Sequence, residues 1–213
     1  MKMNFARFFV LATLVSLQAN ATSLIDGDAA AGKSKAVTCS ACHGAEGNSV
    51  SPLWPNIAGQ NANYIVAQLK AFQSGENDAP ALRSDPLMTS MAMPLSDEDI
   101  RDLAVYFEGL PGAVNSVADE KTVTRAEALY RGGNNESKAA ACLACHGPAG
   151  RGNPAAIYPA LNGQHAAYTA KQLRDYASGG RKSDGKTHIM RDIAGRLSDE
   201  DINAIASYVQ GLK

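Results

Sequence analysis

All four cysteines of this 213-residue chain occur in two copies of the pattern Cys-x-x-Cys-His. The two copies consist of Cys39, Cys42 and His43, and of Cys142, Cys145 and His146. Two thiols three residues apart on a short helix share one face, where they can bond the two vinyl groups along one porphyrin edge. The histidine that follows can bind the iron as an axial ligand. This spacing is the attachment signature of c-type haem, so the sequence predicts two covalently bound haem c groups.

Other interpretations use the same residue types. The cysteine pairs could form two disulfides in an oxidising compartment, or act as thioredoxin-like redox pairs. Neither alternative needs a histidine directly after the second cysteine in both copies. A zinc site would need four ligands at zinc-finger spacings, which the chain lacks.

The sequence around each motif is also repeated, at an offset of 102 to 104 residues. Residues 54–60 correspond to residues 158–164, and residues 95–100 correspond to residues 197–202. Such self-similarity indicates a tandem duplication. We therefore expect one domain at residues 22–111 and another at 125–213, with a linker at 112–124 that lacks apolar periodicity.

A low-spin haem needs a second strong ligand opposite the histidine, and methionine is the candidate. After the first 21 residues the chain has four methionines, which are Met88, Met91, Met93 and Met190. Met190 is alone in the second half, and Met88 is its counterpart, because each lies seven residues before a Leu-Ser pair. We expect Met88 and Met190 in polar, irregular segments as sixth ligands. If the two repeats are aligned in the wrong register, Met91 or Met93 is the ligand in place of Met88.

Each half is predicted to be helical, so the fold class is all-α. Helical spacing or composition marks residues 28–35, 61–72, 125–131 and 166–176. The last helix of each half begins at a Ser-x-x-Asp capping box, at Ser96 and at Ser198. An apolar stripe follows in both helices, and Gly109 and Gly211 end them.

The first 21 residues predict a secretory signal peptide. Lys2 and Arg7 precede an apolar run at residues 8–17, and an A-x-A cleavage site ends at Ala21. The run is shorter than the roughly 20 residues of a membrane span. We expect a periplasmic mature protein, since bacterial c-type haem is attached outside the cytoplasm, with at most peripheral membrane association.

Charge differs between the halves. Residues 22–111 contain 5 basic and 11 acidic residues, a net charge of −6, whereas residues 119–213 contain 13 basic and 10 acidic residues, a net charge of +3. Such a dipole can orient docking on charged partners. The basic residues are scattered and no nucleic-acid-binding motif occurs, so no nucleic-acid partner is expected.

Together, the signal peptide, the tandem haem motifs, the Pro-x-x-x-Gly-Gln segments and the terminal helices resemble the di-haem cytochromes of the cytochrome c4 family over nearly all of the mature chain. The resemblance implies two class I cytochrome c domains with their haems near one another. It also implies a carrier that passes electrons between redox proteins, towards a haem–copper terminal oxidase. The methionine cluster at residues 88–93 and the insertion at residues 132–135 depart from the family pattern.

Resemblance to c-type cytochromes also assigns a role to Pro55 and Pro159. In such proteins a proline at this place accepts a hydrogen bond at its carbonyl from the axial histidine, which fixes the imidazole and tunes the iron. The alternative is a turn-forming proline with no electronic effect. His165 and His188 have no histidine counterpart in the first half, and we expect them at the surface or around the ligands.

An iron with histidine and methionine on its two faces has no open position, so the chain is predicted to carry single electrons and not to be an enzyme. One alternative is the electron-transfer subunit of a dehydrogenase complex, which would use the same haems with a permanent partner. A di-haem peroxidase is another, but it needs one iron open to peroxide, and the aligned methionines argue against it.

Overall fold

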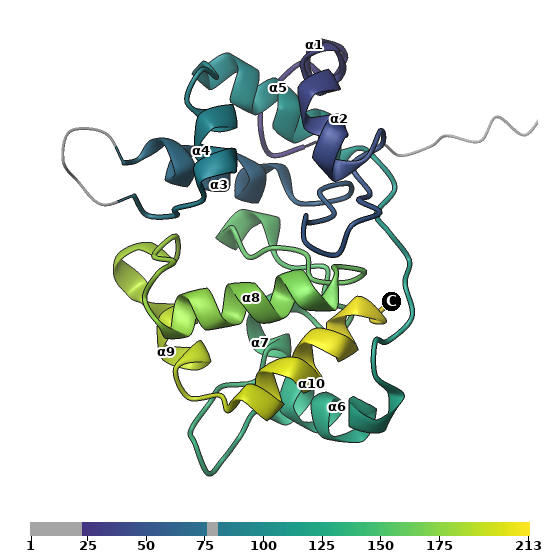
Figure 1. The fold of residues 1–213 in the computed structure, drawn as a ribbon, viewed down its shortest axis with the longest axis vertical. Helices are drawn as coiled ribbons and strands as arrows, with labels where there is room; N and C mark the ends of the chain where they lie inside the picture. The colour runs from purple at the N-terminus through teal and green to yellow at the C-terminus, as the bar shows by residue number, and fades with distance from the viewer. Residues whose placement is uncertain (1–22, 76–80) are drawn as a thin grey trace, which may run out of the picture.

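The computed structural model describes residues 23–75 and 81–213, so the signal peptide predicted at residues 1–21 lies outside the described residues. The described elements are helices joined by loops and three isolated β-bridges, which confirms the predicted all-α fold. They form two stacked halves, and the chain crosses from one to the other along one side (Figure 1). Within the described ranges, no helix is both long and apolar enough to cross a membrane.

The two halves repeat one order of helices. In the first half the described helices are α1 (Ala29–Lys35), α2 (Val37–His43), α3 (Ala62–Gln73), α4 (Pro86–Ala92) and α5 (Asp97–Glu108). In the second half they are α6 (Val123–Gly132), α7 (Leu143–His146), α8 (Ala166–Ala177), α9 (Ile189–Ala194) and α10 (Asp199–Gln210). Single 3₁₀ turns occur as η1 (Glu120–Thr122), η2 (Pro154–Ala156) and η3 (Gly185–Thr187). Helix α6 thus begins two residues before the domain start expected at Arg125.

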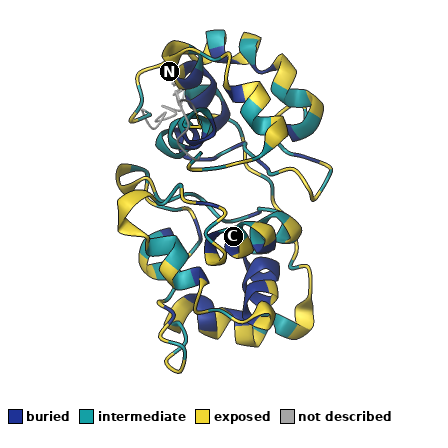
Figure 2. Cartoon of the chain, turned by 60° about the vertical axis from the view of Figure 1, so that its left-hand side comes forward, coloured by how far each residue is buried: buried dark blue, intermediate teal, exposed yellow. Residues whose placement is uncertain are grey.

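The last helix of each half organises the packing. α5 crosses α1 and α3, and α10 crosses α6 and α8 in the same way. Both predicted capping boxes are present: Ser96 and Asp99 bond each other's backbone N–H groups, as do Ser198 and Asp201. The predicted apolar stripes are buried in two clusters, one inside each half (Figure 2).

The glycines predicted to end these helices do not adopt the left-handed conformation that is common at helix C-termini. Both helices stop directly before Gly109 and Gly211, but φ is −74° and −93° at these residues, within the range that any residue adopts. Gly211 serves close packing instead, because a Cβ atom there would collide with Val117 of the connecting segment. Gly32 similarly lets α1 approach the backbone of α5 at Asp102.

Two glutamines join the halves through reciprocal hydrogen bonds. The side chain of Gln60 donates to the carbonyl of Ala160 at 2.9 Å and accepts from its N–H at 2.8 Å. Gln164 donates to the carbonyl of Asn56 at 2.8 Å and accepts from its N–H at 2.9 Å. Each amide side chain therefore pairs with a main-chain peptide of the other half, which fixes how the halves are stacked.

Lys35 joins α1 to α5 through two ion pairs. Its Nζ lies 2.7 Å from Asp102 Oδ2 and 2.8 Å from Asp99 Oδ1. Asp102 is 4% exposed, and its other oxygen accepts a hydrogen bond from the N–H of Asp28 at 2.8 Å. The hydrogen bond from Lys35 holds the pKa of the Asp102 carboxyl below its usual range.

Substitution Asp102→Asn is expected to lower the melting temperature by several degrees at neutral pH, because the amide cannot pair with Lys35 as a charge. A carboxylate with a lowered folded pKa stabilises the fold above its unfolded pKa of about 3.9, and loses that contribution as the pH falls through the folded value. The gap between variant and wild type should therefore close in acid. Circular-dichroism melts from neutral pH to about pH 3 test this. Glu46→Gln, which removes an exposed charge, is the control, and a gap that is constant with pH would contradict the prediction.

Candidate cofactor site

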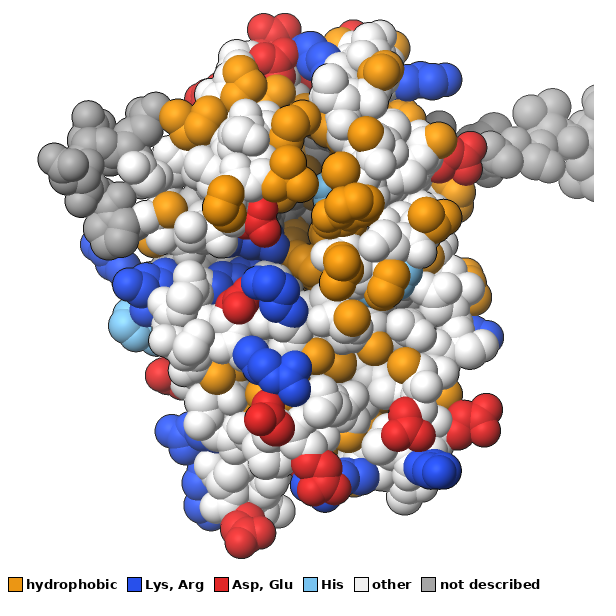
Figure 3. All heavy atoms as spheres, viewed as in Figure 1, with side chains coloured by type: hydrophobic (Ala, Val, Ile, Leu, Met, Phe, Trp, Pro, Cys, Tyr) orange, Lys and Arg blue, Asp and Glu red, His pale blue; other side chains and the backbone are white. Residues whose placement is uncertain are grey.

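Both Cys-x-x-Cys-His motifs line one continuous cavity of about 1210 Å³ that extends through the two halves. Pockets for small organic ligands occupy roughly 300–1,000 Å³. Its apolar wall includes Leu69, Phe72 and Leu103 from the first half, and Leu173, Ile205 and Val209 from the second. On the face drawn in Figure 3, hydrophobic side chains surround a hollow near the level at which the halves meet. The cavity is therefore large enough for more than one extended apolar group.

The cysteines lie on the wall of this cavity. In the first half, helix α2 carries Cys39 and Cys42 one turn apart. In the second half α7 begins at Leu143, so Cys142 is its capping residue and only the second cysteine lies inside the helix. All four thiols are unpaired and line the cavity. Burial raises the pKa of the Cys39 thiol, and it raises the pKa of Cys142 to about 11.

The two motif histidines are each 6% exposed and have the same orientation. His43 Nδ1–H donates to the carbonyl of Pro55 at 2.8 Å, and His146 Nδ1–H donates to the carbonyl of Pro159 at 3.0 Å. Because a carbonyl only accepts, the proton lies on Nδ1 and the lone pair of Nε2 stays available to a metal. Burial lowers the pKa of both imidazoles, which favours the neutral form that binds metals.

Three of the four candidate methionines line the cavity. They are Met88, Met91 and Met190. Met93 is not among the described residues that line the cavity, and it is 40% exposed. Met190 packs against the core of the second half. Met88 is half-buried and Met91 is 36% exposed. The equivalence of Met88 and Met190 in the repeat favours Met88 as the axial ligand, and this assignment stays a prediction.

The expectation that Met88 and Met190 lie in irregular segments is wrong. Both lie in short helices, α4 and α9. Helix α4 begins because the carboxylate of Asp85 accepts from the N–H of Met88 at 3.0 Å, while Pro86 occupies the first helical position. This Asp-Pro signal is visible in the sequence. Helix α9 starts after His188, whose φ of 55° is left-handed and whose side chain makes no capping hydrogen bond. No capping signal comparable to Asp85 therefore precedes Met190.

Neither His165 nor His188 is among the described residues that line the cavity. His165 Nε2–H donates to the carbonyl of Ser49 at 2.9 Å, which adds a contact between the halves. His188 is exposed.

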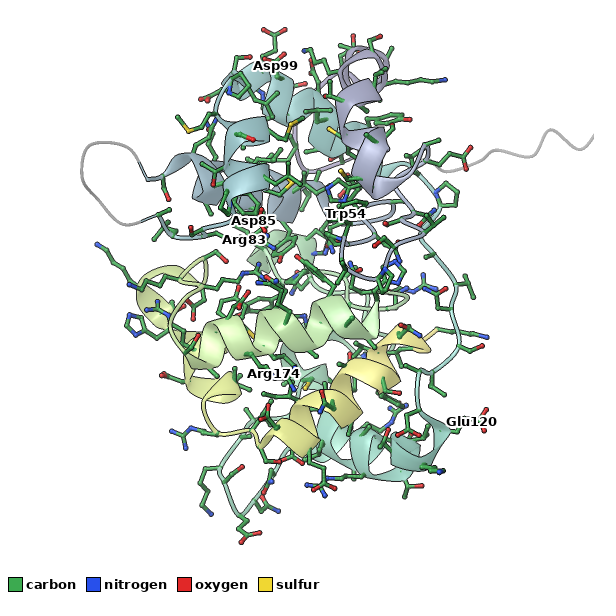
Figure 4. All side chains as sticks on the ribbon, viewed as in Figure 1. Trp54, Arg83, Asp85, Asp99, Glu120 and Arg174 are labelled. Carbon is green, nitrogen blue, oxygen red and sulfur yellow. The ribbon has the colours of Figure 1, made fainter. Side chains whose placement is uncertain are left out.

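Arg83 and Arg181 also line the cavity, and neither is among the predicted site residues. Figure 4 shows Arg83 at the level where the halves meet, well away from Arg174 on α8. The two cavity arginines are 98 residues apart, outside the 102 to 104 residue offset of the repeat. Comparing one repeat with the other therefore does not reveal them as a pair.

The residues of the cavity fit two haem c groups. Each half offers two thiols for the vinyl groups, an imidazole with a free Nε2 lone pair, a thioether and apolar walls. A bound haem supplies one-electron oxidation and reduction. The chain's own residues would tether it through the cysteines, orient the imidazole through the proline carbonyls, and exclude water.

Comparison with known proteins agrees with this geometry. The family model for Cytochrome c matches the chain twice, over residues 29–111 and 133–213. Cytochrome c4 of Stutzerimonas stutzeri is 47% identical over 189 residues, which cover 87% of this chain and 90% of that protein. The crystal structure of reduced recombinant cytochrome c4 from Pseudomonas stutzeri has a TM-score of 0.84 at 45% identity, and the match covers 88% of this chain and 100% of that chain. A thiosulfate dehydrogenase electron acceptor from Stutzerimonas stutzeri strain A1501 is 35% identical, over 93% of this chain and 90% of that protein.

Proposed function

Because this chain belongs to the cytochrome c4 family and carries two covalently bound haem c groups in tandem class I cytochrome c domains, we propose that it passes electrons through the periplasm to a haem–copper terminal oxidase. The chain is a di-haem electron carrier. The proposal of the periplasm rests on the predicted signal peptide. The observation that carries the function is that each Cys-x-x-Cys-His motif shares one apolar cavity with an aligned methionine.

Each half would hold its haem in the same way. The proposed sets are Cys39, Cys42, His43 and Met88 in the first half, and Cys142, Cys145, His146 and Met190 in the second. The carbonyls of Pro55 and Pro159 keep the imidazoles in one orientation. If an imidazole and a thioether both bound each iron, no coordination position would be left for a substrate, which favours electron transfer over bond chemistry.

The unequal charges of the halves support a direction of docking. The first half has a net charge of −6 over residues 22–111 and the second a net charge of +3 over residues 119–213. A basic second half would be attracted to an acidic surface on the oxidase, and such complementarity mainly raises the rate of association.

Stopped-flow oxidation of the reduced protein by a purified haem–copper oxidase tests the proposal. We expect the second-order rate to fall by about tenfold between low and physiological ionic strength. Lys182→Gln and Lys186→Gln together should slow the reaction, whereas Lys33→Gln on the first half should not. A rate that is independent of salt would contradict the proposal that the second half docks on the oxidase. The absence of electron transfer would contradict the proposal that the oxidase is the acceptor.

The thiosulfate dehydrogenase electron acceptor among the relatives supports a second candidate, in which this chain accepts electrons from a dehydrogenase. Co-purification of the tagged chain from cells separates the two. A dehydrogenase that stays bound through gel filtration indicates a subunit, and a chain that elutes alone indicates a free carrier.

A further inference from the structure

Arg83 and Arg181 meet where the two halves touch. An isolated antiparallel β-bridge joins their backbones, and the N–H of Lys182 donates to the carbonyl of Leu82 at 2.7 Å. This bridge brings two guanidinium groups, one from each half, onto the wall of the shared cavity. Arg181 is 4% exposed and Arg83 is half-buried.

Arg181 reaches into the first half. Its Nη2 donates to the hydroxyl of Tyr64 at 2.6 Å and to Gln68 Oε1 at 2.7 Å. Its Nη1 donates to Gln172 Oε1 at 2.6 Å, and its Cζ lies 4.5 Å from the ring centre of Tyr176.

Arg83 makes the equivalent contacts in reverse, with two residues of the second half and two of its own half. Its Nη2 donates to the hydroxyl of Tyr168 at 2.5 Å and to Gln172 Oε1 at 3.0 Å. Its Nη1 donates to Gln68 Oε1 at 3.0 Å, and its Cζ lies 4.6 Å from the ring centre of Phe72. Both glutamine oxygens therefore accept from both arginines, which holds two positive charges close together.

Among the described residues, no carboxylate neutralises these two charges through an ion pair. Their side-chain acceptors are neutral hydroxyls and amides. Burial raises the pKa of the Tyr168 hydroxyl, but the positive charges of Arg83 and Arg181 outweigh burial and lower this pKa below its usual value. Two like charges in a poorly solvated site are unfavourable without an anion, and the planar fork of arginine suits a carboxylate.

The cavity that these arginines line is the one that receives the haems. Haem c carries two propionate carboxylates on the porphyrin edge opposite the one bonded to cysteine. We propose that Arg83 and Arg181 form a shared cationic pair that binds propionates of both haems, so that each arginine raises the reduction potential of both. A cation disfavours the more positive ferric state relative to the ferrous state, and the effect is strong where solvent screens it little. The inference rests on haem binding in both halves and not on the identity of any redox partner.

Anaerobic spectroelectrochemical titration of the loaded protein tests this pairing. Arg83→Gln and Arg181→Gln should each lower both midpoint potentials by about 59 mV, which corresponds to about a tenfold change in the one-electron reduction equilibrium. Arg83→Lys and Arg181→Lys, which keep the charge, should lower them by less than half as much. Arg174→Gln, on the exposed side of α8, is the matched control and should leave both potentials unchanged.

A purely structural role for the arginines has a different signature. It would lower the melting temperature equally in the glutamine and lysine variants while both potentials stay at the wild-type values, and that result would overturn the proposal. A change in one potential alone would overturn the sharing of each arginine between two haems. If Arg181→Gln does not yield folded protein, the half-buried Arg83→Gln and the charge-preserving Arg181→Lys decide the question. The haem count of each variant must be two, which separates this test from a failure of haem binding.

Discussion

Replacing Cys142 and Cys145 together with alanine is expected to leave one covalently bound haem per chain and to unfold most of the second half. Leu161, Met190 and Leu197 pack against the buried core of that half, line the cavity and are only partly buried, so without a haem part of their apolar surface meets water. Burial of each such side chain contributes roughly 1.5–3 kcal/mol, against a total stability of about 5–15 kcal/mol for a typical domain. The haem is thus expected to be part of the core.

Mass spectrometry of the denatured chain counts the covalent haems, and circular dichroism measures the helix that remains. The matched variant is Cys39→Ala with Cys42→Ala, which should spare the second half and lose the first. Ser40→Ala, between those cysteines, is a control that keeps both thiols. Two covalent haems in either double variant, or full helix content with one haem, would show that the thiols or the core are assigned wrongly.

Met190→Ala is expected to convert one haem from low-spin to high-spin and to lower its midpoint potential by tenfold or more in the reduction equilibrium, about 59 mV at least. Met190 lies on the cavity wall and packs against the core, and no other methionine exists in the second half. The vacated position should bind cyanide or peroxide, which the wild-type protein should resist. Visible spectra of the oxidised and reduced protein, with and without cyanide, give the result.

The first half offers a sharper comparison, because three methionines compete there. Met88→Ala should reproduce the spectral change of Met190→Ala, while Met91→Ala and Met93→Ala should stay low-spin. A spectral change in Met91→Ala alone would shift the ligand by one helical turn within α4. A wild-type protein that already binds peroxide at one haem would mean that the methionine assignments are wrong and that an enzyme is present.

Local signals made much of the fold predictable. The haem motif occupies five consecutive residues, and the capping boxes of α5 and α10 involve residues three apart, so short-range chemistry determines both. The same holds for the buried stripes of these helices. The helix around Met88 has an equally local signal, because Asp85 followed by Pro86 begins α4, but its short length and its polar residues are also typical of a loop.

Contacts between the halves could not be predicted in this way. Gln68 on α3 and Arg181 are 113 residues apart, and nothing in the sequence near either residue indicates the other. His165, expected at the surface or around the ligands, donates to the backbone carbonyl of Ser49 in the other half, and such a contact carries no sequence signature. Such pairings depend on how two folded units stack, which is decided after the local elements have formed.

The reciprocal bonds of Gln60 and Gln164 give this single chain the interface of a symmetric homodimer. Gln60 binds residue 160, Gln164 binds residue 56, and both the glutamines and their partners are equivalent positions of the repeat. Isologous contacts of this kind arise when two identical subunits associate about a two-fold axis. Covalent fusion makes such an association intramolecular, so it no longer depends on protein concentration. Fusion also allows the sequences of the two copies to diverge. Their opposite net charges are a property that a symmetric dimer of identical subunits cannot have.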